Sequence, residues 1–275
     1  MTARFKEGSP IFLSIYFLNI IVINLHYNYL YHCIITRKEV CMKIKVRRYH
    51  PQFEPPSIDM EYEIPPQLTL LESLEYIKKE KDRTLTFSSM CRSGVCGSCA
   101  MRVNGKEVLA CEYRVQEGDF VEPLQNSEVL RDLVVDGQKA LETLKNAKAY
   151  PLSMQEKQLQ ESDIEQFEKQ SDCILCQSCY SSCPVYETND SFLGPFALTR
   201  AYRYVIDARE EEKKEHIDAV VRNGIWDCTL CGNCTIVCPQ GIDPKNDILM
   251  LQSWAARFGH TNPNMGSFGS FGLEF

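Results

Sequence analysis

The chain has 275 residues, which is long enough for two domains of ordinary size. Charged residues make up 24% of it and hydrophobic residues 44%, a balance typical of globular rather than disordered proteins. A formal net charge of −7 and the lack of a dense basic stripe argue against a nucleic-acid partner.

Residues 1–41 form an extension whose stretch Ile11–Ile35 has no formal charge and exceeds the ~20 residues that cross a bilayer. Polar side chains interrupt it, which is costly inside a membrane: Asn19, Asn24, His26, Asn28 and His32. A signal-peptide cleavage site and a twin-arginine pair are both missing. Translation could begin at Met42, which we favour; the alternatives are a membrane anchor and a disordered tail.

Regular elements are expected directly after Met42. Lys43–Tyr49 and Ser57–Ile64 alternate apolar and polar residues, as half-buried strands do. Thr69–Lys81 has the apolar spacing of a helix, and Thr69 with Glu72 three residues later is typical of a helix start.

A first group of cysteines follows with the spacing C-x4-C-x2-C and a fourth member after eleven residues. Its members are Cys91, Cys96, Cys99 and Cys111. This is the plant-type ferredoxin spacing for a [2Fe–2S] cluster. Gly94 and Gly97 let the backbone approach the cluster without Cβ clashes. Strands Ala100–Val103 and Glu107–Ala110, joined by Asn104-Gly105 in a type I′ turn, should bring Cys111 back to the loop.

The segment between the cysteine groups is less regular. Glu117–Pro123 is expected to be the last strand of the first domain, and Val129–Val135 a short apolar connector. Ala140–Ala149 is expected to be helical. Leu152–Gln170 is polar and also expected to be helical, and it leads into the second cysteine group.

Two further groups repeat the spacing C-x2-C-x2-C-x3-C-P of two-cluster ferredoxins. The first run consists of Cys173, Cys176, Cys179 and Cys183, and the second run of Cys228, Cys231, Cys234 and Cys238. In this pattern the fourth cysteine of each run serves the other cluster. We therefore assign Cys173, Cys176, Cys179 and Cys238 to one cluster, and Cys183, Cys228, Cys231 and Cys234 to the other.

Other uses of the cysteines are less consistent with the pattern. C-x2-C pairs also make zinc sites, but zinc does not explain a C-P tail that appears twice. Disulfide frameworks belong to small secreted chains. Cluster assembly needs reduced thiolates, so maturation in a reducing compartment is expected.

Helices dominate the second half of the chain. Pro195–Asp207 has an apolar face, and a helix at Asp247–Phe258 follows the last cysteine run. The charged run Ala208–His216 is interpreted as a solvated surface. The tail, 260–275, is rich in Gly, Ser and Phe, which suits disorder or a hydrophobic strip that docks on a partner.

The expected fold class is α+β, and four ranges divide the chain. An extension, 1–41, precedes a β-grasp [2Fe–2S] ferredoxin domain at 42–148. An all-α domain of the bacterial two-cluster ferredoxin type follows at 149–258, and the tail occupies 259–275.

Four stretches, CRSGVCGSCAMRVNG, CILCQSCYSSCPVY, LGPFALTRAYRYVIDAR and CTLCGNCTIVCPQGIDP, resemble the iron–sulfur subunit of succinate dehydrogenase or fumarate reductase. The resemblance covers Met42 to about Trp254. It implies an electron wire without a substrate site of its own, in which the first domain faces a flavoprotein subunit that holds FAD. The second domain would face a membrane anchor or a cysteine-rich acceptor. No Gly-rich dinucleotide motif follows a strand here, which agrees with FAD on a partner.

Two departures from the common quinone-reactive members of that family stand out. Those members replace the second cysteine of the last run by an apolar residue, which leaves a [3Fe–4S] cluster, whereas this chain has Cys231. Their tryptophan after the first C-P and their histidine after the cysteine matching Cys228 correspond here to Val185-Tyr186-Glu187 and Thr229. The resemblance therefore implies a second [4Fe–4S] cluster, with a [3Fe–4S] cluster that lacks Cys231 as the alternative, and an acceptor subunit like heterodisulfide reductase.

The leading hypothesis is an electron-transfer subunit of a succinate dehydrogenase or fumarate reductase complex, at the cytoplasmic face of a membrane. Co-export with a partner to the periplasmic face is the alternative location. Other hypotheses are a subunit of another flavoprotein dehydrogenase, a subunit of a thiol-driven fumarate reductase, and a free-standing ferredoxin. Ligands alone leave the cluster potentials and the direction of electron flow open.

Overall fold

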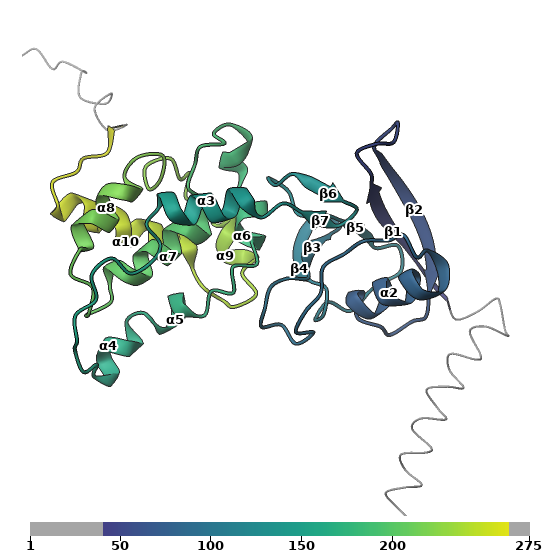
Figure 1. Ribbon diagram of the computed structural model, residues 1–275, viewed down its shortest axis with the longest axis horizontal. Coiled ribbons are helices and arrows are strands. Elements are labelled where there is room, and N and C mark those ends of the chain that lie inside the picture. Colours follow the sequence, from purple (N-terminus) through teal and green to yellow (C-terminus); the bar gives the residue numbers. More distant parts are fainter. Residues whose placement is uncertain (1–40, 264–275) are drawn as a thin grey trace, which may run out of the picture.

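The computed structural model describes residues 41–263 and forms two bodies that lie side by side along the long axis of the molecule (Figure 1). The sheet body comes first along the chain and the helical body second. The interpretations of residues 1–40 and of 264–275 concern segments outside the described residues.

The sheet body is built on a five-stranded mixed sheet with the order β2-β1-β5-β3-β4. Its strands are β1 (Met42–Tyr49), β2 (Ser57–Ile64), β3 (Ala100–Val103), β4 (Lys106–Leu109) and β5 (Phe120–Glu122). β1 pairs antiparallel with β2 and parallel with β5, and β3 pairs antiparallel with both β4 and β5. The predicted strands are present, although the last is shorter than the predicted 117–123.

The alternation of β1 buries one face of the sheet. Ile44 and Val46 are fully buried, and helix α2 (Leu70–Tyr76) lies against the same core with Leu70 and Leu74. Thr69 caps α2 as the sequence predicts, because its side chain accepts from Glu72 N and the Glu72 carboxylate accepts from Thr69 N. The helix continues as a π-helical turn, η1 (Ile77–Lys81).

The β3–β4 hairpin has the predicted turn. Asn104 and Gly105 have φ angles of 51° and 78°, and positive φ at both central residues defines type I′. Asn104 is held there, since its side chain donates to Asp119 Oδ1 at 2.8 Å and accepts from Phe120 N at 2.9 Å. The turn therefore fixes the register that returns the chain from Cys99 to Cys111.

The interpretation of 129–135 as a plain connector is wrong. These residues form a small hairpin of β6 (Val129–Arg131) and β7 (Val134–Val135). Asp132 turns the chain with a φ of 48°, and its buried carboxylate accepts hydrogen bonds from Arg48, Tyr49 N and Thr86 N. A short apolar run gives no indication of these hydrogen-bond donors, so the hairpin could not be predicted from it.

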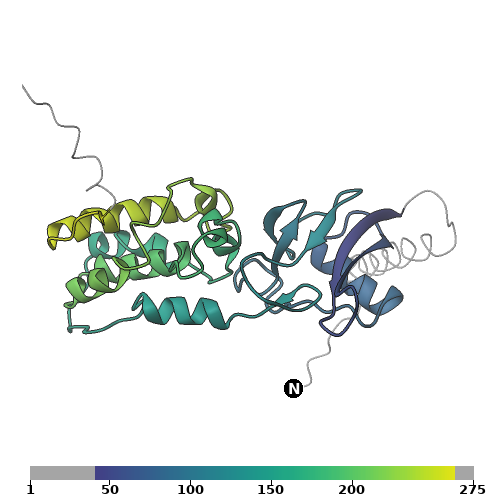
Figure 2. The ribbon, with the colours of Figure 1, turned by 90° about the horizontal axis from the view of Figure 1, so that it is seen from above.

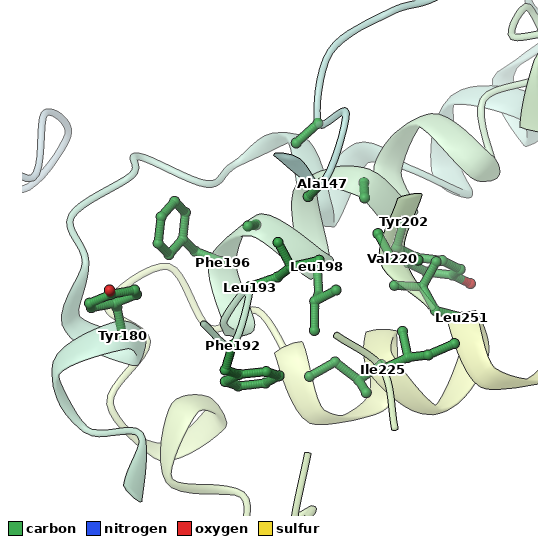
Figure 3. Packing of buried hydrophobic residues seen from close by; sticks show 14 of the residues in the cluster. Ala147, Tyr180, Phe192, Leu193, Phe196, Leu198, Tyr202, Val220, Ile225 and Leu251 are labelled. Carbon is green, nitrogen blue, oxygen red and sulfur yellow. The ribbon is translucent and has the colours of Figure 1, made fainter. Parts of the chain in front are cut away.

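The helical body surrounds α7 (Pro195–Val205). Its other helices are α3 (Gln138–Asn146), α4 (Glu161–Glu165), α5 (Glu168–Ser171), α6 (Ser178–Ser181), η2 (Pro184–Glu187), α8 (Lys213–Val220), α9 (Asn233–Ile236) and α10 (Pro244–Arg257). Figure 3 shows the core, where Phe196 and Leu198 of α7 pack with Phe192, Val220 and Leu251. α3 also packs on this core through Ala140.

Two expectations for this body are wrong for one reason. Residues 152–160 are not helical, and the charged run 208–216 is not wholly solvated, because Glu210 and His216 are buried. The Glu210 carboxylate accepts from Leu152 N at 2.9 Å and Ser153 N at 3.0 Å, so it holds the incoming chain in an extended conformation. Its pKa is lowered by these N–H donors, although burial opposes them.

Within residues 41–263, no helix has the length and apolar character that spanning a bilayer requires.

Arg48→Ala should destabilise the sheet body by about 3 kcal/mol, because it leaves the buried Asp132 carboxylate without its charged partner. The Arg48 side chain is 13% exposed and donates to Asp132, Tyr62 and Thr84. Thermal unfolding followed by circular dichroism checks this. Lys43→Ala, which breaks the exposed pair with Glu61 at 2.9 Å, is the control and should change little. Equal effects of the two variants would contradict the buried network.

Candidate functional site

The first cysteine group lies at the end of the sheet body that faces the helices. Cys99 precedes β3 and Cys111 follows β4, and their Sγ atoms lie 3.5 Å apart. Backbone N–H groups of the loop point at sulfur: Gly94 N donates to Cys111 Sγ at 3.3 Å and Ser93 N to Cys91 Sγ at 3.4 Å. Such donors stabilise thiolates, so the loop is suited to anionic sulfur ligands.

The thiols of this loop have different environments. The N–H of Ser93, with help from Cys96, lowers the pKa of Cys91 to about 6. Burial raises the pKa of Cys99 instead. Gly94 has a φ of 74°, which favours glycine; a Cβ there would also lie 2.2 Å from Glu112 Oε1, but that flexible carboxylate can move aside.

A second set of thiols comes from both cysteine runs. Cys173, Cys176, Cys179 and Cys238 line one cavity, together with apolar residues such as Phe196 and Ile242. Burial raises the pKa of Cys179 well above its ordinary value, and charge on Cys176, Cys173, Cys234 and Cys238 adds to the rise. The N–H of Ile242 donates to Cys238 Sγ at 3.4 Å.

The remaining four cysteines form a third set. Burial raises the pKa of Cys183 to about 11 and that of Cys234 to about 12, and neighbouring Cys228 and Cys231 contribute to both rises. Cys183 and Cys234 are buried, whereas Cys231 is exposed. The first three cysteines of each run thus lie beside the fourth cysteine of the other run.

The exchange follows from the packing of two short helices. α6 lies between Cys176 and Cys183 in the chain, α9 lies between Cys231 and Cys238, and the two helices contact each other. Figures 1 and 2 show both at the end of the helical body that faces the sheet.

Among residues 41–263, no three His, Cys, Asp or Glu side chains converge closely enough to hold a single metal ion. Ligands of a polynuclear cluster bind different irons and therefore lie further apart than those of one tetrahedral ion. The donor sets, all sulfur and partly surrounded by apolar side chains, fit iron–sulfur clusters.

A polar strap between the two bodies was not predicted from the sequence. The Asn126 side chain donates to the carbonyl oxygens of Tyr180 and Cys183 at 2.9 and 3.2 Å. Ser181 Oγ donates to Glu107 Oε1 at 2.8 Å and accepts from Gln125 N at 2.9 Å. Asn126 and Ser181 look like ordinary loop residues, so only the tertiary structure reveals this role.

The residues that follow the first C-P are part of the hydrophobic core of the helical body. Val185 and Tyr186 are each 7% exposed, and the Tyr186 ring lies 4.1 Å from that of Tyr180. Burial raises the pKa of Tyr180 to about 12. These residues therefore serve packing beside Cys183.

A buried acid, which no sequence pattern indicates, lies behind the second set of thiols. Asp247 of α10 accepts from Gln170 Nε2 and from Thr199 Oγ1, both at 2.9 Å, and Thr199 lines the cavity of Cys173. Burial raises the pKa of Asp247 to about 6, although both hydrogen bonds lower it.

Two protein families match the chain in order. The 2Fe-2S iron-sulfur cluster binding domain matches residues 43–142, and the 4Fe-4S dicluster domain matches residues 169–242. These matches cover the three cysteine groups.

Relatives of similar layout are found among known proteins. The fumarate reductase iron-sulfur subunit of Mycobacterium tuberculosis is 36% identical over 227 residues, which are 78% of this chain and 92% of that protein. One subunit of the fumarate reductase (CoM/CoB) of Methanothermobacter marburgensis is 33% identical over 79% of this chain but only 45% of its own length. A chain of the Mycobacterium smegmatis Sdh1 complex shares the fold, with a TM-score of 0.69 at 22% identity, over 82% of this chain and 99% of that one.

Asp247→Asn should stabilise the helical body more at neutral than at acidic pH. The pKa of folded Asp247 lies above its ordinary 3.8, so the ionised form weakens the fold above about pH 6, and the penalty fades as the pH falls toward 4. The gain in Tm should therefore be larger at roughly pH 7.5 than at roughly pH 5.5, and the gain in stability at most about 3 kcal/mol.

Tryptophan fluorescence measures this, since Trp226 and Trp254 both contact the helical core. Asp218→Asn is the control: the pKa of Asp218 is lowered, first by Lys214, so its replacement should not show such a gain. A pH-independent effect of Asp247→Asn would contradict the burial of its charge.

Proposed function

We propose that this chain carries electrons through three clusters within a succinate dehydrogenase or fumarate reductase complex. The chain belongs to the family of fumarate reductase iron–sulfur subunits. The observation that carries this is the grouping of twelve cysteines into three all-sulfur sets, one in the sheet body and two in the helical body.

The proposed ligands follow the three sets. Cys91, Cys96, Cys99 and Cys111 bind the [2Fe–2S] cluster of a β-grasp ferredoxin domain, within the proposed range 42–148. Cys173, Cys176, Cys179 and Cys238 bind a [4Fe–4S] cluster, and Cys183, Cys228, Cys231 and Cys234 bind the third cluster, in a two-cluster ferredoxin domain at 149–258. Support comes from the N–H groups that donate to Cys91, Cys111, Cys228 and Cys238.

The chemistry asked of this chain is positioning rather than acid–base catalysis. The clusters supply one-electron redox chemistry when bound. The thiolates hold them, backbone N–H groups stabilise the negative charge on sulfur, and buried apolar residues such as Phe196 and Ile242 limit the access of water. Succinate or fumarate would bind to a flavoprotein subunit that carries FAD.

The third cluster is proposed to be a [4Fe–4S] cluster, because Cys231 supplies a fourth thiol beside Cys183, Cys228 and Cys234. A [3Fe–4S] cluster would leave Cys231 without a role. The exposure of Cys231 suits the end of the relay that meets the next carrier. That carrier is a membrane-anchor or cysteine-rich subunit, and the complex lies at the cytoplasmic face of a membrane.

A thiol-driven fumarate reductase is the second candidate. Its support is the likeness to the fumarate reductase (CoM/CoB) chain, together with the fourth cysteine of the last run. In that case the partner beside the third cluster would oxidise thiols and donate electrons to this chain, instead of exchanging electrons with a quinone. Identification of the chain that co-purifies with the native protein separates the two candidates.

Cys231→Ala should remove one iron and change the spin signature. The anaerobically purified wild type should contain about ten irons, with EPR signals of one [2Fe–2S] and two [4Fe–4S] clusters after reduction. The variant should contain about nine irons and show an oxidised [3Fe–4S] signal. Cys41→Ala, outside the three sets, is the control and should leave the iron content unchanged. A [3Fe–4S] signal in unoxidised wild type would refute the proposed ligand.

The flavoprotein partner makes a separate prediction. The chain alone should bind no FAD and should not reduce fumarate with a dye as electron donor. With its co-purified flavoprotein, succinate should reduce the [2Fe–2S] cluster, which EPR detects. Flavin in the isolated chain, or fumarate turnover by it, would overturn this division of labour.

A further inference from the structure

The two bodies touch backbone to backbone between two cysteine loops. At Gly97, beside Cys96 of the first loop, a Cβ would lie 2.7 Å from Cys176 Cβ and 2.9 Å from Cys176 Cα. It would also lie 3.1 Å from the carbonyl oxygen of Ile174. A contact this close to backbone atoms has no room for a methyl group, so any larger residue must push the loops apart.

A hydrogen bond crosses the same boundary. Gln240 Nε2 donates to the carbonyl oxygen of Gly94 at 3.1 Å, and the N–H of Gly94 donates to Cys111 Sγ at 3.3 Å. Gln240 comes two residues after Cys238. A short path of covalent and hydrogen bonds therefore leads from Cys238 to Cys111.

The surroundings keep this contact in register. Ile174 and Cys176 of the helical body pack against the hydrophobic core of the sheet body. Lys169 Nζ donates to the backbone oxygen of Gln240 at 2.6 Å, which anchors that residue independently of its side chain. A crevice lined by Cys96, Ser98, Leu175 and Gln177 runs beside the contact.

We propose that the Gly97–Cys176 contact, braced by Gln240, is the crossing point for electrons between the sheet body and the helical body, and that Gly97 is the residue that sets its spacing. The inference rests on the proposed function. With clusters bound to the two loops, one electron would cross at a time, and the cluster that loses it would be oxidised by one electron as the other is reduced by one. No bond breaks, and no proton needs to move.

Glycine at position 97 also has a local explanation, because its φ of 72° suits glycine in any cluster loop. The local explanation predicts that alanine strains the loop but leaves the spacing between bodies alone. The proposal predicts that alanine separates the two cysteine loops. Gly118 offers a matched control, since it has a φ of 81° in the same body and no atom within 4 Å of its Cβ position.

The test compares the full-length holoprotein with its Gly97→Ala and Gly118→Ala variants, all purified anaerobically. Iron content and EPR first establish the clusters. Microwave power saturation of the [2Fe–2S] signal then reports its distance from the reduced [4Fe–4S] cluster, because magnetic dipolar coupling falls with the cube of the separation. Gly97→Ala should saturate at severalfold lower power than wild type, and Gly118→Ala should match wild type. Freeze-quench EPR after a reductant pulse should show slower equilibration between clusters in Gly97→Ala alone.

Gln240→Leu keeps the inference testable if Gly97→Ala loses its [2Fe–2S] cluster. This variant deletes the donor to Gly94 and retains the Lys169 contact. It should also lower the microwave power at which the [2Fe–2S] signal saturates and slow the equilibration of electrons between the clusters. If the variants that keep both clusters saturate and equilibrate as wild type does, the inference is overturned and the proposed function is left intact. Wild type without [2Fe–2S] and [4Fe–4S] signals would instead overturn both.

Discussion

The helical body depends on the exchange of one cysteine between its two runs. Cys183 lies with the second run and Cys238 with the first, and this holds only while α6 and α9 stay in contact. Pro184 and Pro239 stiffen the chain directly after the exchanged residues. The apolar core around α7 lies behind both sets through Tyr180 and Phe196, so its packing and the cysteine geometry support each other.

The contact between the two bodies is held differently. Hydrogen bonds from Asn126, Ser181 and Gln240 end on backbone or carboxylate oxygens close to the cysteine loops. Hydrogen bonds restrict direction as well as distance, whereas an apolar contact lets two surfaces slide. A protein that must keep two redox centres at a fixed separation benefits from the directional kind of contact.

Much of this architecture could be predicted because its signals are local. The alternation of Ile44 and Val46, the capping pair Thr69 and Glu72, and the Asn104-Gly105 turn each contain their own explanation within a few residues. The cysteine spacing likewise predicts ligand sets from local sequence alone, and Cys173, Cys176, Cys179 and Cys238 line one cavity; their roles as ligands stay a prediction. The burial of Glu210 could not be predicted, because its partners at Leu152 and Ser153 are distant in sequence. The same holds for Asn126 and for the contact of Gly97 with Cys176.

The exchange of cysteines also constrains how the protein is made. On the proposed assignment, three ligands of one cluster leave the ribosome with the first run, and the fourth, Cys238, follows only after α7 and α8. Closing so long a loop costs conformational entropy that the metal–sulfur bonds must offset. Neither cluster of the helical body can be completed during most of its synthesis. Nascent chains therefore need either a scaffold that delivers iron late or protection of bare thiols until translation passes Cys238.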